Sequence, residues 1–392
     1  MVVRAALEVT VGEQITLQIF TGGYVGDVVS FEQVRDKLDE VLEMIPASRV
    51  VMGWALEPDL YRRAARYLAG KDIEFYLWLP VFSETGLVKN CSPVVGSSGQ
   101  TAAHYHLGEG ENFEFYCPAD PLNADNVISL FTEQFGGVGF DGVFLDKIRY
   151  PSFANGRDGG FSCFCPRCVE RYERGGLDVV RLRERIDQMT DVPFGVTSYA
   201  DGVYAFSDEL WQRYFALRSQ VVADALSRMC QTFRQMGYRI GMDVFAPFLG
   251  EFVGQDIPRL SALCDFVKPM MYRTTWAPAG PGFEADALLT QTRAGDGGRA
   301  AFGEILGADL DARPFDLDFS VRQLAWLAGA CTCPVEAGVE INRRPSVVDA
   351  DPAYIRETLA AFSRTDANGY VLSWNLLEAP ADNVDAVAGF LR

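Results

Sequence analysis

Short hydrophobic runs alternate with amphipathic stretches along this chain, a pattern typical of β-strands that alternate with α-helices. The runs predict eight strands, near residues 15–20, 49–56, 73–82, 138–151, 239–245, 266–272, 335–342 and 370–375. Amphipathic periodicity predicts helices at residues 31–44, 59–69 and 122–135, a helical region that runs to about residue 237 with an interruption near residues 192–200, and a short final helix. Eight such units favour an α/β fold in which one (β/α)8 TIM barrel closes on itself. An open, doubly wound sheet is the alternative.

Three long segments interrupt the alternation, at residues 83–121, 151–176 and 277–332. We interpret them as βα-loop insertions of a single barrel domain over residues 1–392. A structureless loop as long as residues 83–121 is usually functional, and this one holds the two histidines of the chain, His104 and His106. No G-x-G-x-x-G follows a predicted strand and no G-x-x-x-x-G-K-[ST] occurs, so the sequence does not support a dinucleotide site or a P-loop.

The stretch over residues 138–151 is the most informative one for function. Glycines precede it and a proline ends it, which is typical of a buried parallel strand with polar groups at its carboxyl end. Side chains alternate along a strand, so Phe144 and Asp146 share one face and Lys147 and Arg149 take the other. If the first face points inward, Asp146 is a lone carboxylate at the barrel mouth, where such barrels keep their chemistry. The alternative is that Asp146 caps the next helix or pairs with Arg149.

The overall charge narrows the range of partners. Hydrophobic residues make up 48% of the chain and charged residues 22%, as in ordinary globular proteins. The formal net charge is −18, which argues against nucleic acid or an anionic membrane surface as a partner. The N-terminus has no signal-like apolar segment, and no apolar run approaches the ~20 residues of a membrane span. We therefore expect a cytoplasmic protein, and the sequence leaves its oligomeric state open.

Nine cysteines, an odd number, are a poor basis for a disulfide framework. Three of them, Cys163, Cys165 and Cys168, have C-x-C-x-x-C spacing, which can place three thiolates on one ion. A structural zinc site needs four ligands, so Cys91 or Cys117 would have to complete it. Partly buried free thiols are the alternative. With only two histidines in the chain, we expect no catalytic zinc and no other cofactor for catalysis.

The predicted strand ends bring aromatic and charged side chains to one crevice. These are Trp54, Trp78, Asp146, Asp243, Lys268, Tyr272, Glu340, Asn342 and Trp374. Aromatic rings together with carboxylates suit sugars, because the C–H face of a pyranose packs on a ring while carboxylates bind hydroxyls. Hydrolysis of a glycosidic bond needs two carboxyl groups that flank it. Asp146, Asp243 and Glu340 are the candidates.

Here the sequence resembles the glycoside-hydrolase-like TIM barrels. Their fourth strand has the motif F-D-G-I-x-x-D-Y-I/V-R-Y/F-P, to which the chain is similar at Phe140-Asp-Gly-Val-Phe-Leu-Asp146-Lys-Ile-Arg149-Tyr-Pro151. Lys268-Pro-Met-Met-Tyr272 resembles their sixth strand and Ser373-Trp374-Asn375 their eighth. The Cys117-Pro-Ala-Asp-Pro121 loop and the cysteine cluster resemble features of the same group. The resemblance spans residues 115–376. It implies a retaining or inverting hydrolase of an oligo- or polysaccharide, with Asp146 at the position of the catalytic carboxylate.

The chain departs from the chitinases, whose strand is D-G-x-D-x-D-x-E. It has Phe144 and Ile148 where their outer aspartate and acidic glutamate belong, so we do not expect chitinase chemistry. The acid must then come from another strand. Glu340 is the first choice, because strands four and seven are often paired in such barrel hydrolases, and Asp243 is the second. Sequence leaves open which carboxylate is the acid, since that depends on desolvation and on separation.

Several further side chains are predicted to position the substrate. They are Arg149, Lys268, Tyr272, Trp374, Trp54, Trp78 and Asn342, whereas Lys147 is expected to pack behind the barrel. Lys268 would bind an acidic or sulfated sugar, or hold Asp146 ionised. Two other functions stay open: a Schiff-base aldolase with Lys268 as its nucleophile, and a carbohydrate-binding barrel without catalysis.

Overall fold

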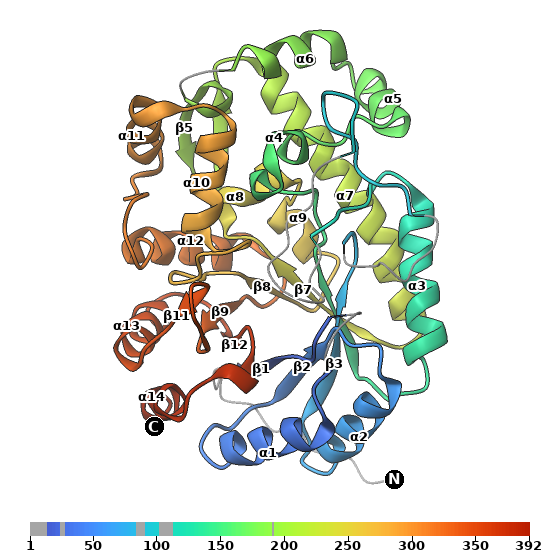
Figure 1. The fold of residues 1–392 in the computed structure, drawn as a ribbon, viewed down its shortest axis with the longest axis vertical. Helices are drawn as coiled ribbons and strands as arrows, with labels where there is room; N and C mark the ends of the chain where they lie inside the picture. The colour runs from blue at the N-terminus through green and yellow to red at the C-terminus, as the bar shows by residue number, and fades with distance from the viewer. Residues whose placement is uncertain (1–13, 24–27, 84–90, 102–112, 190–191) are drawn as a thin grey trace.

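Eight parallel strands form a nearly closed barrel in the computed structural model (Figure 1). The structure describes residues 14–23, 28–83, 91–101, 113–189 and 192–392. The barrel strands are β1 (Gln14–Phe20), β2 (Arg49–Gly53), β3 (Glu74–Pro80), β4 (Gly142–Asp146), β7 (Arg239–Val244), β8 (Phe266–Pro269), β9 (Glu336–Glu340) and β12 (Gly369–Ser373). They neighbour one another in the order β8-β7-β4-β3-β2-β1-β12-β9, and isolated bridges join β8 to β9. The predicted TIM barrel is confirmed, and the open sheet was the wrong alternative.

Helices surround the strands, as Figure 1 shows. The outer ring consists of α1 (Phe31–Leu42), α2 (Pro58–Ala69), α3 (Pro121–Phe135), α7 (Glu209–Gln235), α12 (Leu317–Ala330), α13 (Pro352–Phe362) and α14 (Ala381–Phe390). Buried apolar side chains on these helices, such as Val34 and Leu38 of α1, pack against the outward faces of the strands and form the main core. No helix within the described residues is long and apolar enough to cross a membrane.

The segments that we interpreted as loop insertions contain regular structure. After β4 come α4 (Gly156–Gly160), α5 (Pro166–Arg174) and α6 (Val179–Asp187), and after β8 come α10 (Pro281–Gln291) and α11 (Gly295–Leu306) before α12. Figure 1 shows α4, α5, α6, α10 and α11 together beyond one side of the barrel. The shorter helices α8 (Pro247–Gly250) and α9 (Ile257–Ser261) follow β7. A loop interpretation of residues 277–332 is therefore wrong: a proline at the start of α10 and the Asp316 cap of α12 are helix-start signals.

Two short hairpins are additions to the predicted fold. β5 (Val196–Ala200) pairs with β6 (Val203–Phe206), where only an interruption of the helical region was predicted. β10 (Arg343–Arg344) pairs with β11 (Val348–Asp349) in the segment that follows β9. The first long insertion has bridges at its ends, at Ser83 and Phe115, but His104 and His106 lie outside the described residues.

The barrel interior holds two ion pairs among aromatic rings. Near the amino ends of the strands, Arg49 Nη1 lies 2.8 Å from Glu336 Oε1, and the Arg49 guanidinium lies 4.0 Å from the centroid of the Phe266 ring. Toward the carboxyl ends, Lys268 Nζ lies 2.9 Å from Asp243 Oδ2. The rings that fill the space are separate from the main core and include Trp54, Tyr76, Trp78, Phe144 and Phe266. Phe144 faces inward, as strand alternation predicts.

Candidate functional site

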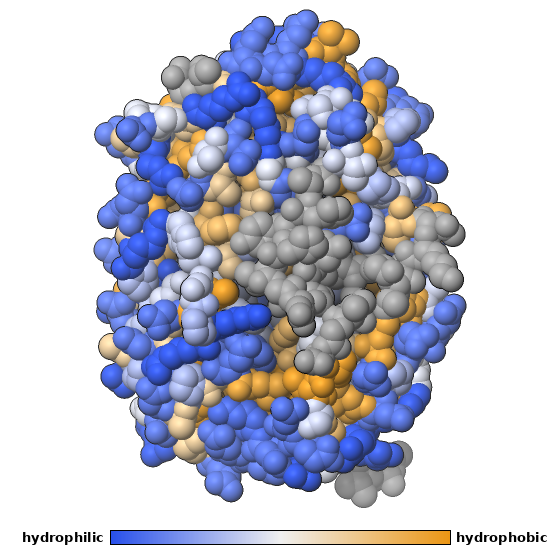
Figure 2. Space-filling model, viewed as in Figure 1, coloured by the Kyte–Doolittle hydropathy of each residue, from blue (hydrophilic) through white to orange (hydrophobic). Residues whose placement is uncertain are grey.

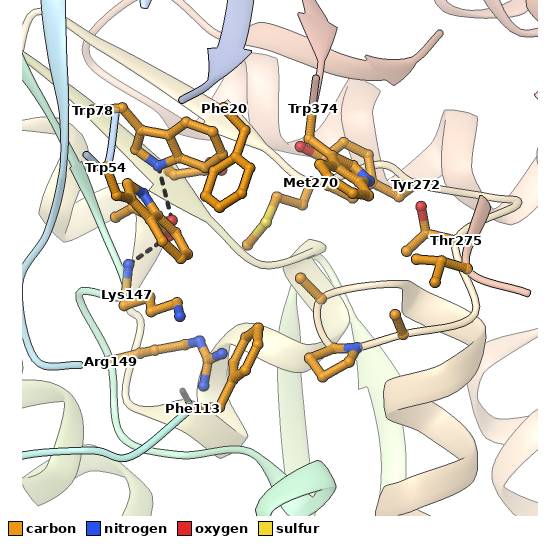
Figure 3. Close-up of a pocket in the computed structure, with 16 residues that line it drawn as sticks. Phe20, Trp54, Trp78, Phe113, Lys147, Arg149, Met270, Tyr272, Thr275 and Trp374 are labelled. Atoms are coloured by element: carbon orange, nitrogen blue, oxygen red, sulfur yellow. Dashed lines mark hydrogen bonds between the residues drawn. The ribbon is translucent and has the colours of Figure 1, made fainter. Parts of the chain in front are cut away.

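A cleft opens at the carboxyl ends of the strands, and aromatic rings form much of its wall (Figure 3). Its lining residues are Phe20, Trp54, Trp78, Phe113, Asp146, Lys147, Arg149, Asp243, Met270, Tyr272, Thr275, Ala277, Pro278, Ala279, Val347 and Trp374. The rings of Phe20, Trp54 and Trp78 contact one another edge to face, with centroids 5.2 Å apart for Phe20–Trp54 and 5.3 Å apart for Trp54–Trp78. This packing fixes the rings, so the cleft presents a rigid apolar wall.

Asp146 is held in one orientation at the end of β4. The Trp78 indole N–H donates to Oδ2 at 2.9 Å, and the backbone N–H of Lys147 donates to Oδ1 at 2.5 Å. The residue is 7% exposed and lines the cleft. Both oxygens accept hydrogen bonds, as an ionised carboxylate can, and both donors belong to rigid parts of the barrel. Among the described residues, the Asp146 carboxylate neither caps a helix nor forms an ion pair with Arg149.

Asp243 lies on the neighbouring strand at the same height. β4 and β7 are adjacent, and their register pairs Leu145 with Met242, so Asp146 and Asp243 are the next residues on the two strands. Adjacent strands are about 4.8 Å apart. The two carboxylates lean to opposite sides, Asp146 toward Trp78 on β3 and Asp243 toward Lys268 on β8. The barrel thus brings two carboxyl groups together in the lining of the cleft.

A network of polar side chains surrounds Asp243. Lys268 is fully buried, and its ammonium donates to Asp243 Oδ2 at 2.9 Å, to Gln18 Oε1 at 3.2 Å and to the Tyr272 hydroxyl. Asp243 Oδ1 is buried and has no hydrogen-bond partner among the described residues. Burial raises the pKa of Asp243 to about 7, and the negative charge of Asp146 adds to this, while the Lys268 ammonium opposes it. A carboxyl group of this kind exchanges its proton near neutral pH.

Lys147 lies in the cleft, which corrects the expectation that it packs behind the barrel. β4 ends at Asp146, and Lys147 has a positive φ of 51°, so the alternation of the strand stops before it. Its ammonium lies 4.3 Å from the ring centroid of Trp54 and 3.7 Å from that of Phe113. Figure 3 shows Lys147 and Arg149 side by side on the wall that faces the space of the cleft.

Arg149 also lines the cleft, at the edge of its floor. Its guanidinium lies 4.7 Å from the ring centroid of Phe115 and 4.1 Å from that of Phe245. Burial lowers the pKa of Arg149 to about 10, against the attraction of Glu284, Asp146 and Asp243. The side chain is therefore cationic at neutral pH. Two cations beside the aromatic wall make this side of the cleft attractive to an anionic group.

Glu340, the first-choice acid of the sequence analysis, is fully buried and does not line the cleft. Its carboxylate accepts from the backbone N–H groups of Arg273, Thr274 and Thr275 at 2.9, 2.9 and 2.7 Å. The hydroxyls of Thr274, Thr275 and Tyr354 also donate to it. Burial raises the pKa of Glu340 and these donors oppose the rise. The carboxylate holds the loop after β8, whose next residues line the cleft.

The other predicted side chains divide into two groups. Trp54, Trp78, Tyr272 and Trp374 line the cleft, whereas Lys268 and Asn342 are fully buried outside its lining. Sequence reasoning did not select several lining residues, namely Phe20, Phe113, Met270, Thr275, Ala277, Pro278, Ala279 and Val347. Phe20 ends β1 as the other selected residues end their strands, so its position was a usable signal. The lining residues on loops do not end a predicted strand, so the sequence offered no comparable reason to select them.

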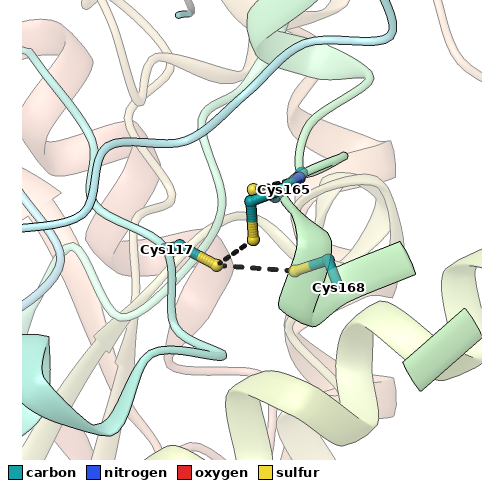
Figure 4. Close-up of side chains that lie close together, drawn as sticks. Cys117, Cys165 and Cys168 are labelled. Carbon is teal, nitrogen blue, oxygen red and sulfur yellow. Dashed lines mark hydrogen bonds between the residues drawn. The ribbon is translucent and has the colours of Figure 1, made fainter. Parts of the chain in front are cut away.

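Four cysteines meet beside the insertion that follows β4, and Figure 4 shows three of them, Cys117, Cys165 and Cys168. Cys117, which precedes α3, joins Cys163, Cys165 and Cys168, and all four sulfurs lie within 4.8 Å of one another. Cys117 Sγ lies 3.6 Å from Cys165 Sγ and 3.4 Å from Cys168 Sγ. Of the two expected candidates for the fourth position, the structure selects Cys117 and leaves Cys91 out. Such a set of thiols can hold a metal ion.

Comparisons with known proteins reveal similarity at the level of fold. No protein-family model matches the chain. No curated protein sequence matches it. Among solved structures, the PgaB (BpsB) glycoside hydrolase domain from Bordetella bronchiseptica has a TM-score of 0.59 at 14% identity, over 97% of this chain and 98% of that one. α-L-Fucosidase isoenzyme 2 from Paenibacillus thiaminolyticus has a TM-score of 0.54 at 12% identity, over 97% of this chain and 48% of that one. The fold is therefore that of glycoside hydrolase barrels, as the sequence motifs implied.

Replacement of Glu340 by glutamine is expected to lower the stability of the fold. The substitution puts an amide N–H₂ against groups that are themselves donors, so at least one buried hydrogen bond is lost and the charge assistance of the others with it. We expect the free energy of unfolding to fall by about 2–4 kcal/mol, measured by urea denaturation.

Glu357→Gln is the matched control for this measurement. Glu357 contacts Arg273 as well, through a 3.2 Å ion pair, but its side chain is 57% exposed. The control is expected to change the free energy of unfolding by no more than about 0.5 kcal/mol. Equal stability of Glu340→Gln and wild type would contradict the anchoring role of Glu340.

Proposed function

We propose that this protein hydrolyses a glycosidic bond of an oligo- or polysaccharide, with Asp146 and Asp243 as its two carboxyl groups. The observation that carries the proposal is their common height on adjacent strands at the mouth of an aromatic cleft. The fold of glycoside hydrolase barrels supports it at the level of architecture. Sugar rings pack on aromatic faces, and a pair of carboxyl groups is what hydrolysis of the bond between them requires.

The surroundings of the two carboxyl groups suggest different roles. Asp243 has a pKa raised to about 7 and an oxygen, Oδ1, without a partner, so it holds a proton near neutral pH and donates it to the leaving oxygen. Asp146, whose two oxygens accept hydrogen bonds from Trp78 and a backbone N–H, acts as the ionised group that attacks or activates water. The product's anomeric configuration decides between attack and activation of water.

Asp243 is preferred over Glu340 because Asp243 lines the cleft and Glu340 does not. Glu340 accepts hydrogen bonds from three backbone N–H groups and three hydroxyls, and its carboxylate is buried outside the cleft lining. The Lys268 ammonium likewise donates its hydrogen bonds to protein groups, because it contacts Asp243, Gln18 and Tyr272 inside the barrel. A Schiff-base lysine must be neutral and must reach a carbonyl group of the substrate. The ion pair with Asp243 opposes both, because it favours the charged form of Lys268 and holds its ammonium inside the barrel.

The cations of the cleft suggest an acidic or substituted sugar. Lys147 and Arg149 lie on the same wall as Trp54 and Phe113, within reach of a sugar that packs on these rings. A uronate carboxylate or a sulfate there would gain charge-assisted hydrogen bonds. This role, which the sequence analysis gave to Lys268, passes to Lys147 and Arg149 in the proposal.

Asp146→Asn and Asp243→Asn are expected to abolish hydrolysis while the fold is retained. Each variant removes one of the two groups that act on the bond, so kcat should fall by at least about 10³-fold. The measurement is release of reducing sugar from a panel of neutral and acidic oligosaccharides by wild type, both variants and Glu340→Gln. Far-ultraviolet circular dichroism and thermal unfolding establish that the variants are folded.

Two outcomes of this panel would overturn the assignment. Full activity of Asp243→Asn would remove Asp243 as the acid. Binding of a sugar by wild type without any hydrolysis would favour the carbohydrate-binding barrel. The pH profile is an independent test of Asp243 as the acid. Wild-type kcat/KM is expected to fall above pH about 7, because the protonated form of Asp243 is lost there.

Replacement of Lys268 by methionine is expected to shift that limb of the pH profile upward. The ammonium stabilises the ionised form of Asp243, so its removal raises the pKa of Asp243 further and keeps the acid protonated to higher pH. We expect a shift of roughly 1 pH unit or more in the fall of kcat/KM. Lys71→Met, at an exposed position, is the control and should leave the limb in place. An unchanged limb in Lys268→Met would contradict Asp243 as the titrating acid.

We also propose that the four cysteines hold one structural zinc ion. In a tetrahedral site with Zn–S bonds of about 2.3 Å the sulfurs lie about 3.8 Å apart, close to the spacing of Cys117, Cys165 and Cys168. Backbone N–H groups of Val95 and Cys165 donate to Cys163 Sγ, as they do to metal-bound thiolates. Four thiolates leave no open position, so the ion would join the loop before α3 to the insertion after β4 and take no part in the reaction.

Purified protein is expected to contain about one zinc ion per chain, measured by mass spectrometry of the metal. Cys117→Ser and Cys168→Ser should each lower zinc content strongly, because three thiolates hold the ion less tightly. Cys230→Ser, at a buried cysteine away from the cluster, is the matched control and should keep its zinc. Equal zinc content in all variants, or none in wild type purified without chelator, would contradict the site.

A further inference from the structure

A groove continues from the cleft along the loop after β8 and the β10–β11 hairpin. Two hollows lie there, and the cleft shares Thr275 with one and Val347 with the other. Both hollows share Thr274, Trp276 and Asp349 with each other. The three spaces are therefore neighbours that share parts of their walls. The surface over β11 is largely hydrophilic in Figure 2, unlike the apolar wall of the cleft.

Trp276 is the aromatic side chain of this groove, and it is unusually open to solvent. It is 37% exposed and is the only aromatic residue among the large exposed apolar residues in the described parts of the chain. Its indole is held in place, with the ring of Phe283 edge-on at 5.8 Å between centroids, and its backbone N–H donates to Val347 O at 2.7 Å. A fixed, exposed ring costs little entropy when a sugar packs against it.

Arginines line the same groove, although the chain carries a net charge of −18. Arg313 lies with its guanidinium 3.8 Å from the ring centroid of Trp276, and within the described ranges no carboxylate pairs with it. Arg343 donates to Asp382 Oδ2 and Asn383 Oδ1, and Arg344 lies 5.9 Å from the ring centroid of Trp374 in the cleft. The lining of the two hollows includes one acidic residue, Asp349, and four arginines, these three and Arg273.

We propose that this groove is a further sugar-binding subsite, in which the substrate chain leaves the cleft, packs on Trp276 and places a carboxylate or sulfate group on Arg313. The subsite rests on the proposed function, since the same chain would have its reacting bond at Asp146 and Asp243. It implies a substrate longer than the cleft itself, with anionic groups on more than one sugar.

The net charge of the protein sharpens this inference. A chain with 53 acidic and 35 basic residues repels polyanions over most of its surface. Binding of a polyanion must therefore come from a local cluster of cations rather than from a general attraction. The groove supplies such a cluster at the exit of the cleft, together with a ring on which a sugar can pack.

The test measures binding without turnover, in an Asp146→Asn background. Affinity electrophoresis in gels that contain polygalacturonate, dextran sulfate or neutral dextran gives a dissociation constant for each polymer. We expect binding to one of the two anionic polymers and weaker binding to dextran, and the polymer that binds tells carboxylate from sulfate. Trp276→Ala and Arg313→Met should each weaken the binding at least about tenfold, and added salt should reduce the effect of Arg313.

Arg322→Met is the matched control, because Arg322 also lies over an aromatic ring, 5.5 Å from the centroid of Phe319, and lines neither hollow. It should bind like the parent. Failure of both anionic polymers to bind, or equal binding by the parent, Trp276→Ala and Arg313→Met, would overturn the subsite. These results are separate from those on the proposed function, since a protein that hydrolyses sugars but shows unchanged binding in both variants loses only the subsite.

Discussion

The barrel depends on the pairing of charges that it buries. Arg49 with Glu336 near one end of the strands, and Lys268 with Asp243 near the other, place four charged groups where water is largely excluded. The effective cost of desolvation is several kcal/mol per ion, so each charge needs its partner and further hydrogen bonds to be tolerated. Thr16 completes the first pair and Gln18 the second. These buried pairs thus restrict the positions of the side chains inside the barrel. The cleft lies next to the second pair, at the carboxyl ends of the strands.

The second pair gives Asp243 a property that an isolated surface aspartate lacks. Burial favours its neutral form and the Lys268 ammonium favours its ionised form, and the balance brings its pKa to about 7. Lys268 is therefore a positioning residue in our proposal, which acts on the sugar only through Asp243. Without an ion-pair partner, the same lysine would suit Schiff-base chemistry. Its pairing with Asp243 therefore favours glycoside hydrolysis over the aldolase alternative.

The fold was predictable from the sequence because buried strands require apolar runs and outer helices require apolar faces. The bounds of β1, β7 and α1 lie within one or two residues of those predicted. The β10–β11 hairpin was not predictable in this way, since strands of two residues are too short to have a period. The helices α10 and α11 lie in a segment rich in glycine and alanine, where an amphipathic pattern is weak.

The site was predictable in part, and the failures have physical causes. Strand alternation placed Asp146 at the mouth of the barrel correctly, but it requires extended backbone, which Lys147 leaves with a φ of 51°. The residue types do not predict this change, because lysine rarely adopts a positive φ. Glu340 is the last residue of β9, and Asp243 is the last but one of β7. Only the loop that folds over Glu340 with its N–H groups distinguishes them, and that loop comes from another part of the chain.

That loop connects the barrel to the surface. Glu340 holds the backbone at Thr274 and Thr275, Thr275 lines the cleft, and Trp276 is the next residue, in the groove. A buried carboxylate with six protein donors is a costly way to hold a loop unless the position of the loop matters. The position of the loop matters in our proposal, because Thr275 lines the cleft and the next residue, Trp276, lines the proposed subsite. A movement of the loop that widened the groove would also move the wall of the cleft. In our proposal, the carboxylate on β9 thus fixes the distance between the reacting bond and the continuing substrate chain, although it touches neither.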